Sequence, residues 1–435
     1  MNRIIYKGFA VAFVALTLTA CAGRKTYERP NVVNEKLFRT DNIPTDSLSS
    51  ANVSWRDIFT DATLQGHINK ALSNNLDVRV AMQNVASAQA YLKQSKAAFI
   101  PTLAAQANYT RATSSINAMG GVGERTYGNL WDLTGSASWE ADIWGKLSAQ
   151  KRASYASYLA TVEAQKAVQS EVVATLATAY YQLLMLDEQK KVLEQTIDFR
   201  QKSLETTKHL KEAGSTTEVA TKQIEALVYN AQAQLISIKN SVWALENTIC
   251  VLLGEEPHTI ERTTLAEQNF PTEFKQGYAA KLLQNRPDVA RAELSLRNAF
   301  EMTNVARAAF YPTLTLSARG GFSSTELDTW ISAKSIFANF VAGLAQPILN
   351  GRQIRTQYEV RQIEQETALL NFKKVVLSAG KEVSDAMQHF SSQTEFIDLK
   401  TKEMKAYQEA TDYSKQLFDS GMVNYLEVIT AEVNR

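Results

Sequence analysis

The sequence of 435 residues is poor in glycine, proline and cysteine, with 18 glycines, 8 prolines and 2 cysteines. Two cysteines are too few for a disulfide framework or a four-cysteine zinc site. The scarcity of glycine and proline excludes a collagen-like chain, and a hydrophobic content of 45% excludes a disordered one. The 46 basic residues nearly cancel the 45 acidic ones. A net charge of +1 argues against a nucleic-acid partner, because such proteins carry a basic excess on one face.

Motifs that carry chemistry are also missing. The four histidines, at positions 67, 209, 258 and 389, are scattered without partners at ligand spacing. Gly145 and Lys146 lack the other glycine and the serine or threonine of a phosphate-binding loop. Cys250 is a lone cysteine in an apolar stretch, which is typical of a buried core residue. We therefore predict no catalytic residue, no cofactor and no metal site.

The beginning of the chain has the features of an export signal. A basic start leads into an apolar run of about a dozen residues, which is too short to span a bilayer. The run ends in Leu18–Cys21, which resembles a bacterial lipobox whose cysteine becomes the lipidated N-terminus. Cleavage of an ordinary leader after Ala22 is the alternative. We predict a signal peptide over residues 1–20, lipidation of Cys21 and a lipidated linker over residues 21–54.

Very long stretches contain neither glycine nor proline. The first runs from Lys146 to Ala213 and consists mostly of strong helix formers. One continuous helix of that length would extend about 100 Å, whereas ordinary globular helices have about 8 to 20 residues. Gly214 is placed to end this helix, and the polar residues that follow are N-cap candidates for a second one. The pattern predicts a helix hairpin over residues 146–253 with its tip at Gly214.

The chain carries an internal repeat. Ala98–Leu103 recurs as Ala309–Leu314, and the residues before each segment also match without a gap. The period is far too long for a solenoid and indicates a duplicated half. We predict two structural repeats, residues 55–262 and residues 263–435, each with a helix, two strands and a long helix hairpin.

The second repeat is expected to be truncated. Its long hairpin, residues 352–435, has a glycine tip at Gly421 but only a short return helix after it. The return helix of the first repeat is much longer, so we expect Arg435 to lie inside a helix and the natural chain to continue.

Between the helices, apolar and polar residues alternate with the period of a strand. Each segment is about as long as a tilted strand that crosses a membrane, and aromatic residues lie near the ends. A soluble sheet is the alternative. Strands in a membrane would require several copies of the chain, because four strands cannot close a barrel and open edges are not tolerated in lipid. The predicted strands are residues 101–113, 130–143, 312–323 and 336–348.

A further set of motifs accompanies the duplication. They comprise Trp55, Phe59 and Leu64, the run Ala71–Asp77, the Phe-x-Pro-Thr-Leu strand entries at Phe99 and Phe310, the run Asn285–Val289, and the two glycine tips. In this order, and with the lipobox, they resemble the outer membrane efflux protein family, the TolC-like exit ducts, in its lipoprotein branch. The resemblance covers residues 55–435, and no single motif decides it.

The resemblance implies a mixed α/β membrane protein that works as a homotrimer in the bacterial outer membrane. In that family, each protomer contributes four strands to one shared 12-stranded β-barrel. Long antiparallel helices form an α-helical barrel across the periplasm. The helix tips dock on a periplasmic adaptor (membrane fusion) protein, which couples to an inner-membrane RND-type pump.

The resemblance also implies roles at the helix tips. Family members close their periplasmic end with acidic rings shortly after the second glycine tip. Glu427 occupies the first of these positions and is a candidate periplasmic gate, whereas Thr430 occupies the second and departs from the pattern. The alternative for Glu427 is a solvated glutamate on a helix surface. The expected adaptor contacts are Gly214, Ser215, Gly421 and Met422.

The function implied by the resemblance is that of the outer membrane channel in a tripartite efflux system. Such a channel exports drugs, toxic compounds or metal ions as a passive duct and is not an enzyme. An exit duct for type I protein secretion is an alternative with the same architecture. A periplasm-spanning structural lipoprotein without a pore is another alternative, and the amphipathic strands argue against it.

Overall fold

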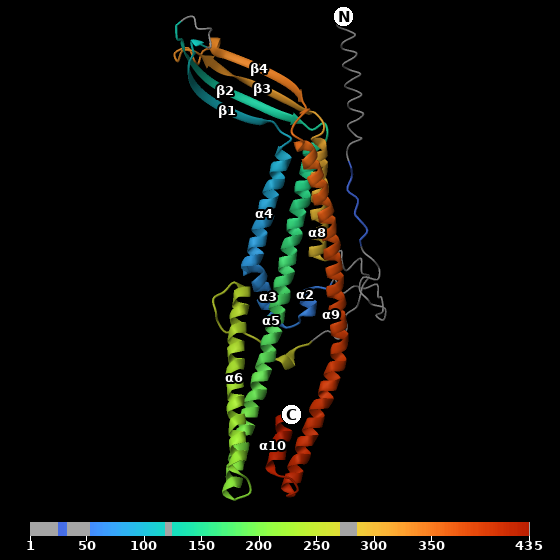
Figure 1. Ribbon diagram of the computed structural model, residues 1–435. Helices are drawn as coiled ribbons and strands as arrows, with labels where there is room; N and C mark the ends of the chain where they lie inside the picture. The colour runs from blue at the N-terminus through green and yellow to red at the C-terminus, as the bar shows by residue number, and fades with distance from the viewer. Residues whose placement is uncertain (1–24, 33–52, 118–123, 270–284, 435) are drawn as a thin grey trace. The chain divides into compact units, whose positions relative to one another are not determined.

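The computed structural model describes residues 25–32, 53–117, 124–269 and 285–434 (Figure 1). The predicted signal peptide and Cys21 lie outside the described residues. Among the described helices, none combines the length and the apolar character that crossing a bilayer requires. The helices are α2 (Trp55–Ile58), α3 (Ala62–Asn74), α4 (Leu76–Ala97), α5 (Lys146–Glu212), α6 (Glu218–Leu253), α8 (Pro287–Ala308), α9 (Gln353–Asp419) and α10 (Tyr425–Asn434). The strands are β1 (Thr102–Thr113), β2 (Tyr127–Ala141), β3 (Thr313–Ser324) and β4 (Ile336–Ala345), and the short 3-10 helices are η3 (Leu265–Glu267) and η4 (Ala333–Ser335).

The chain divides into two compact units, and each is assembled from segments of both predicted repeats. The first unit holds the four strands within Asn84–Glu163 and Ala290–Lys374, together with the described residues before Val32. The second unit holds the described parts of Val32–Gln83, Ala164–Val289 and Val375–Arg435. Segments that are far apart in the sequence therefore fold together in each unit.

In the first unit, the strands form one antiparallel sheet in the order β1-β2-β3-β4 (Figure 1). The pairing of β2 with β3 joins the two predicted repeats, since α5 and α6 separate these strands in the sequence. Among the described strands, β1 and β4 are the edges of the sheet.

The bounds of all four strands differ from the predicted ones, and the largest differences are at the start of β2 and the end of β4. β2 begins at Tyr127, before the predicted residue 130, because its pairing with β1 continues to that residue. β4 ends at Ala345, before the predicted residue 348, because Pro347 has no backbone N–H to donate to a ladder.

The register gives the sheet one apolar and one polar face, because alternate residues of a strand point to opposite sides. The apolar face carries Leu103, Tyr109, Trp131, Leu133, Leu314, Leu316, Phe322, Phe340 and Leu344. The polar face carries Gln106, Asn108, Asp132, Thr134, Ser136, Thr315, Arg319 and Asn339. Leu103 is 81% exposed and Phe340 is 72% exposed, so the described part of the chain leaves these positions of the apolar face uncovered.

The two longest helices, α5 and α9, have 67 residues each and extend about 100 Å. At the start of α5, the carboxylate of Asp142 accepts hydrogen bonds from the backbone N–H groups of Leu147 (2.8 Å) and Ser148 (2.9 Å). These two bonds satisfy helix donors that have no partner within the helix.

The core of the second unit gathers apolar side chains from α3, α5 and α6. Trp55 and Phe59 pack against it, and Cys250 is buried within it. Its largest buried members are Leu64, Ile68, Leu176, Tyr180, Leu183, Leu184, Ile249, Leu253 and Ile260.

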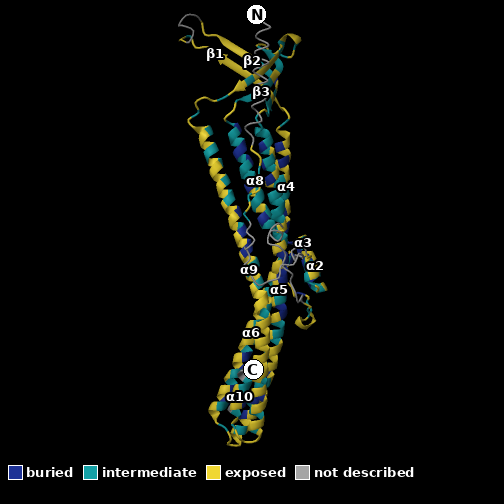
Figure 2. Cartoon of the chain, turned by 90° about the vertical axis from the view of Figure 1, so that its right-hand side faces the viewer, coloured by how far each residue is buried: buried dark blue, intermediate teal, exposed yellow. Residues whose placement is uncertain are grey.

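The long helices bury only part of their surface within the chain, as the exposed residues in Figure 2 show. On α9, large apolar side chains are more than half exposed. They include Ile363, Leu370, Leu377, Phe396 and Leu399.

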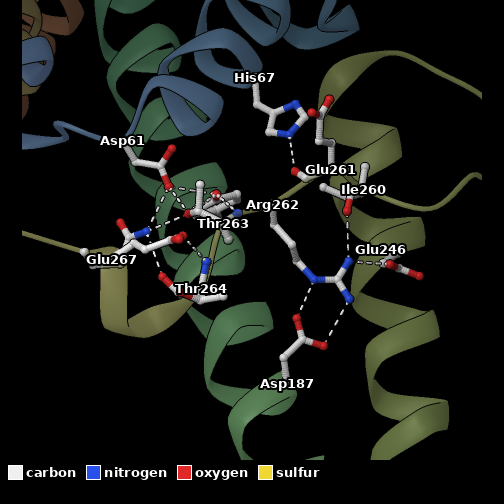
Figure 3. A network of polar contacts seen from close by, with 12 residues as sticks. Asp61, His67, Asp187, Glu246, Ile260, Glu261, Arg262, Thr263, Thr264 and Glu267 are labelled. Atoms are coloured by element: carbon white, nitrogen blue, oxygen red, sulfur yellow. Dashed lines mark hydrogen bonds and ion pairs between the residues drawn. The ribbon is translucent and has the colours of Figure 1, made fainter.

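Asp61 is the centre of a polar network in the second unit (Figure 3). Its carboxylate caps the N-terminus of α3 and accepts hydrogen bonds from the Tyr180 hydroxyl (2.8 Å), the Thr263 hydroxyl (2.5 Å) and the Gln268 amide (2.9 Å). Burial acts to raise the pKa of Asp61, but these hydrogen bonds outweigh it and lower the pKa to about 2. The network therefore favours the ionised carboxylate.

Arg262, next to Thr263 in the same network, is held by two carboxylates (Figure 3). Its guanidinium binds Asp187 through two nitrogens and Glu246 at 2.6 Å, and it also donates to the carbonyl of Ile260 at 2.9 Å. The segment after α6 is thereby tied to both α5 and α6.

Candidate functional site at the helix tips

Both long hairpins turn through the same backbone motif. Gly214 has a φ of 76° and Gly421 has a φ of 71°, which is the left-handed region that glycine adopts without strain. The N–H of Ser215 donates to the carbonyl of Leu210 at 2.8 Å, and the N–H of Met422 donates to the carbonyl of Leu417 at 2.9 Å. These bonds define a Schellman motif at each tip.

The helix that follows each tip begins with a side-chain cap. The Thr217 hydroxyl accepts a hydrogen bond from the N–H of Ala220 at 3.3 Å, and α6 follows. At the second tip, the Asn424 side chain accepts a hydrogen bond from the N–H of Glu427 at 3.3 Å. The two tips thus share their glycine, their cap and the spacing between them.

Glu427 lies in the first turn of α10, where the helix dipole favours a negative charge. Its backbone N–H is used by the cap, and its side chain is exposed. Within the described residues, no cation is paired with the Glu427 carboxylate. The carboxylate is therefore available to face other copies of the chain, whereas Thr430 is an exposed residue without charge.

The predicted adaptor contacts lie at the ends of the hairpins. Ser215 is exposed, and Met422 is 75% exposed. At the first tip, Lys211 and Glu218 form an ion pair across the turn. The hydrogen bond from Lys211 is the main cause that lowers the pKa of the Glu218 carboxyl. This pair closes the base of the turn and leaves the tip itself uncovered.

A second acidic residue of α10 escaped the sequence analysis. Glu432 is largely buried and pairs with Lys415 of α9 at 2.6 Å. The Lys415 ammonium also lies 5.7 Å from the ring centroid of Phe199 on α5. The sequence indicates this pair only by placing a lysine and a glutamate on opposite arms of a predicted hairpin. The contact links the α9–α10 hairpin to α5.

The two hairpins enclose a cavity of about 390 Å³ near these contacts. Arg200 lines it and donates to the carbonyl of Leu227 at 2.8 Å. Burial lowers the pKa of Arg200 below its usual value. The cavity is also lined by Phe199, Ser203, Ile224, Lys415, Ile429 and Glu432. The packing between the hairpins is therefore incomplete at this level.

The residues that follow Cys21 in the sequence bind to α8 in the first unit. Arg29 forms an ion pair with Glu293 at 2.8 Å, and the ring of Tyr27 packs edge-on against Phe300 at 5.6 Å. Burial, with a smaller contribution from Glu293, raises the pKa of Tyr27 to about 12. These contacts hold Tyr27 and Arg29, which are close in sequence to Cys21, against α8.

A model of the outer membrane efflux protein family matches residues 67–255 and 279–434. The chain therefore belongs to the outer membrane efflux protein family, and the predicted fold class, efflux-channel function and outer membrane location are confirmed.

Individual relatives match nearly the whole chain. The cation efflux system protein CusC of Escherichia coli K12 is 27% identical over 430 residues, which covers 96% of this chain and 91% of CusC. The probable outer membrane lipoprotein SilC of Salmonella typhimurium is 27% identical over 410 residues, which covers 93% of this chain and 87% of SilC. The solvent efflux pump outer membrane protein SrpC of Pseudomonas putida is 27% identical over 435 residues, which covers 97% and 90%.

A crystal structure of CusC, from work on its folding and transmembrane channel formation, has the same fold. The two structures agree with a TM-score of 0.84 at 25% identity, and the match covers 94% of this chain and 92% of that one.

Proposed function

We propose that three copies of this chain form a passive duct that carries small molecules from an inner-membrane pump to the cell exterior. The observation that carries the proposal is the sheet, which has one apolar face, one polar face and two edges that are not paired with any described residue. In a bilayer, unpaired edges must be closed by further strands, and the apolar face must point to lipid.

The size of the barrel supports three copies over two. Two copies of the four-stranded sheet would give eight strands, and barrels of about 8 strands are filled by their own side chains. Three copies give a 12-stranded barrel, whose backbone radius is about 12 Å for strands about 4.8 Å apart and tilted by about 40°. The exposed apolar side chains of α9 support the same assembly, because neighbouring copies would cover them.

The partners and cargo proposed for the duct follow from the hairpin tips and from the relatives. The uncovered tips suit docking by a periplasmic adaptor protein, which would couple the duct to an inner-membrane pump of the RND type. CusC and SrpC are named for cation efflux and solvent efflux, which favours small solutes or metal ions over secreted proteins. The transport step itself requires no catalytic residue in this chain.

We also propose that Cys21 carries a lipid anchor to the outer membrane. The lipoprotein SilC supports it, and so do the contacts of Tyr27 and Arg29 with α8, since they fix the chain shortly after Cys21. Along the chain, we propose a cleaved leader, a short linker and two repeats. The pairing of β2 with β3 joins the two repeats in one sheet.

The assembly is tested with the purified full chain in detergent and in planar lipid bilayers. We expect the mass of a trimer by light scattering and stepwise ion conductance after insertion. A monomer that conducts nothing would instead favour the structural lipoprotein, and conductance with transport of a co-expressed protein substrate would favour secretion.

Replacing Glu427 by glutamine is expected to reduce the preference of the channel for cations over anions about two- to fourfold. Three carboxylates on one ring attract cations, and salt screens this attraction only in part at distances near the Debye length. The readout is the reversal potential in a KCl gradient. Glu409→Gln, which changes an exposed glutamate of α9, is the matched control. Equal selectivity in wild type and Glu427→Gln would leave Glu427 as a solvated surface residue.

Replacing Met422 by glutamate is expected to weaken binding of the periplasmic adaptor protein by at least about tenfold. A charge at the centre of an apolar contact costs on the order of 1.4 kcal/mol or more. Surface plasmon resonance with the purified trimer measures the effect. Met404→Glu is the matched control, since Met404 is 55% exposed on α9 and lies away from the tip in sequence. Unchanged affinity for Met422→Glu would contradict docking at the tip.

A further inference from the structure

The middle of the polar face of the sheet carries one positively charged side chain. Arg319 lies halfway along β3 and is paired in register with Ser136 of β2 and Asn339 of β4. Its neighbours on the same face of β3 are Ser317 and Gly321, which are too small to cover it. The side chain of Arg319 is exposed.

The guanidinium of Arg319 has only weak partners. Nη2 lies 3.4 Å from the Thr134 hydroxyl, and Cζ lies 5.7 Å from the ring centroid of Phe337. Neither partner carries a charge. Among the described residues, no carboxylate forms an ion pair with Arg319. Its positive charge is therefore not neutralised by any residue that the structure describes.

The acidic residues of the same face lie too far along the strands to neutralise Arg319. Asp132 pairs in register with Ser323 and accepts a hydrogen bond from its hydroxyl at 2.6 Å. Glu140 pairs in register with Thr315 and binds Lys146 at 3.0 Å. Each acidic position is four residues from Arg319 along the ladder.

This separation isolates the charge electrically. Four residues of a strand span about 13 Å. The Debye length is about 8 Å at physiological ionic strength, so Asp132 and Arg319 act on a solute as separate charges. Glu140 is in addition compensated by Lys146. The polar face is thus positively charged at the position of Arg319 along the strands.

We propose that Arg319 forms a cationic ring in the lumen of the outer membrane barrel and makes this level of the duct select for anionic solutes over free cations. The inference rests on the proposed trimer, in which the polar face lines the lumen and three guanidinium groups surround the axis. At a backbone radius of about 12 Å, side chains that reach inward bring the charge within about a Debye length of any passing solute. Organic anions would pass this level more readily than uncomplexed metal ions.

The local potential is measured with a cysteine at position 136, which faces Arg319 across the ladder. The full chain with Ser136→Cys is treated in the assembled trimer with the anionic reagent sulfonatoethyl methanethiosulfonate and with its cationic trimethylammonioethyl counterpart. We expect the ratio of the anionic to the cationic rate to fall about two- to fourfold when Arg319→Gln is added. Cys250 does not interfere, because it is buried.

Two further variants separate charge from structure. Arg319→Lys retains the charge and is expected to retain the ratio. Arg111→Gln removes an arginine from the opposite face of the same sheet and is expected to leave the ratio unchanged. A ratio that does not respond to Arg319→Gln, or that falls equally with Arg319→Lys, would overturn the cationic ring.

The failure of this inference is distinguishable from the failure of the proposed function. If neither reagent reaches position 136 in a stable trimer, the polar face does not line a lumen and the duct itself is wrong. If both reagents react and Arg319→Gln changes nothing, the duct stands and only the ring is wrong. A reversal potential in a KCl gradient that moves toward cation preference in Arg319→Gln supports the ring independently of the cysteine.

Discussion

Replacing Gly321 by alanine is expected to abolish the trimer in the outer membrane. A Cβ atom at this position would overlap the carbonyl oxygen of Leu133, and it would lie 2.9 Å from the Leu133 carbonyl carbon and 3.0 Å from the Cα of Thr134. All three atoms belong to the backbone of β2, so no side chain can move aside. The pairing of β2 with β3 must give way, at a cost of about 3 kcal/mol or more.

This loss has consequences for assembly because β2 and β3 join the two halves of the sheet. If they separate, each protomer presents two separate two-stranded hairpins in place of one four-stranded sheet, and the proposed barrel cannot close. The measurement is the fraction of trimer that resists dissociation in unheated detergent gels of outer membrane extracts.

Gly343→Ala is the matched control for this prediction. Gly343 lies on the same polar face in the neighbouring strand β4, and a Cβ atom there would meet nothing within 4 Å. We expect its trimer fraction to equal that of the wild type, since alanine is tolerated in a strand at least as well as glycine. Equal trimer fractions for Gly321→Ala and Gly343→Ala would refute the close contact of β2 and β3 at Gly321.

The features that the sequence predicts well are those set by neighbouring residues. The absence of glycine and proline between Lys146 and Ala213 indicates the long helix, because strong helix formers occupy most of that stretch. Gly214 and Gly421 indicate the tips, because a left-handed residue is needed to end a helix in this way. The period of two in the segments after Pro101 and Pro312 indicates strands and even their apolar faces.

The features that escape the sequence depend on partners far away in the chain. Arg319 stands on the polar face by alternation alone, but its isolation follows from the register between β2 and β3, which are separated by α5 and α6. The pair Lys415–Glu432 likewise depends on how α10 packs against α9. Local periodicity carries no information on such pairings, because it defines which face a residue occupies and not what it meets.

The network at Asp61 is the clearest case of a long-range arrangement. Its hydroxyl donors, Tyr180 and Thr263, are 119 and 202 residues away in the sequence. Asp61 alone is recognisable as an N-cap, since it precedes a helix by one position. Its second role, as the acceptor that joins α3, α5 and the segment after α6, emerges only in three dimensions.

Asp61→Ala is expected to destabilise the folded chain by about 3 kcal/mol, because it removes a helix cap and leaves three partly buried donors without their acceptor. The measurement is the shift of the urea unfolding midpoint of the trimer in detergent at neutral pH, followed by circular dichroism. Asp57→Ala, at an exposed aspartate of α2, is expected to shift the midpoint little. Equal midpoints for the two variants would contradict the role of Asp61.

The contribution of the Asp61 charge also has a defined pH dependence. The pKa of Asp61 is about 2 in the folded chain, whereas the ordinary value of 3.8 applies in the unfolded chain. The folded state therefore binds the proton more weakly than the unfolded state does. The stabilisation is therefore complete above about pH 4 and is lost as the pH falls through about 2. Asp61→Asn keeps the size of the side chain but has no charge to lose. The difference in the free energy of unfolding between wild type and Asp61→Asn should therefore shrink as the pH falls from about 4 to about 2. A difference that stays constant down to about pH 2 would show that packing, and not the charge, holds the network together.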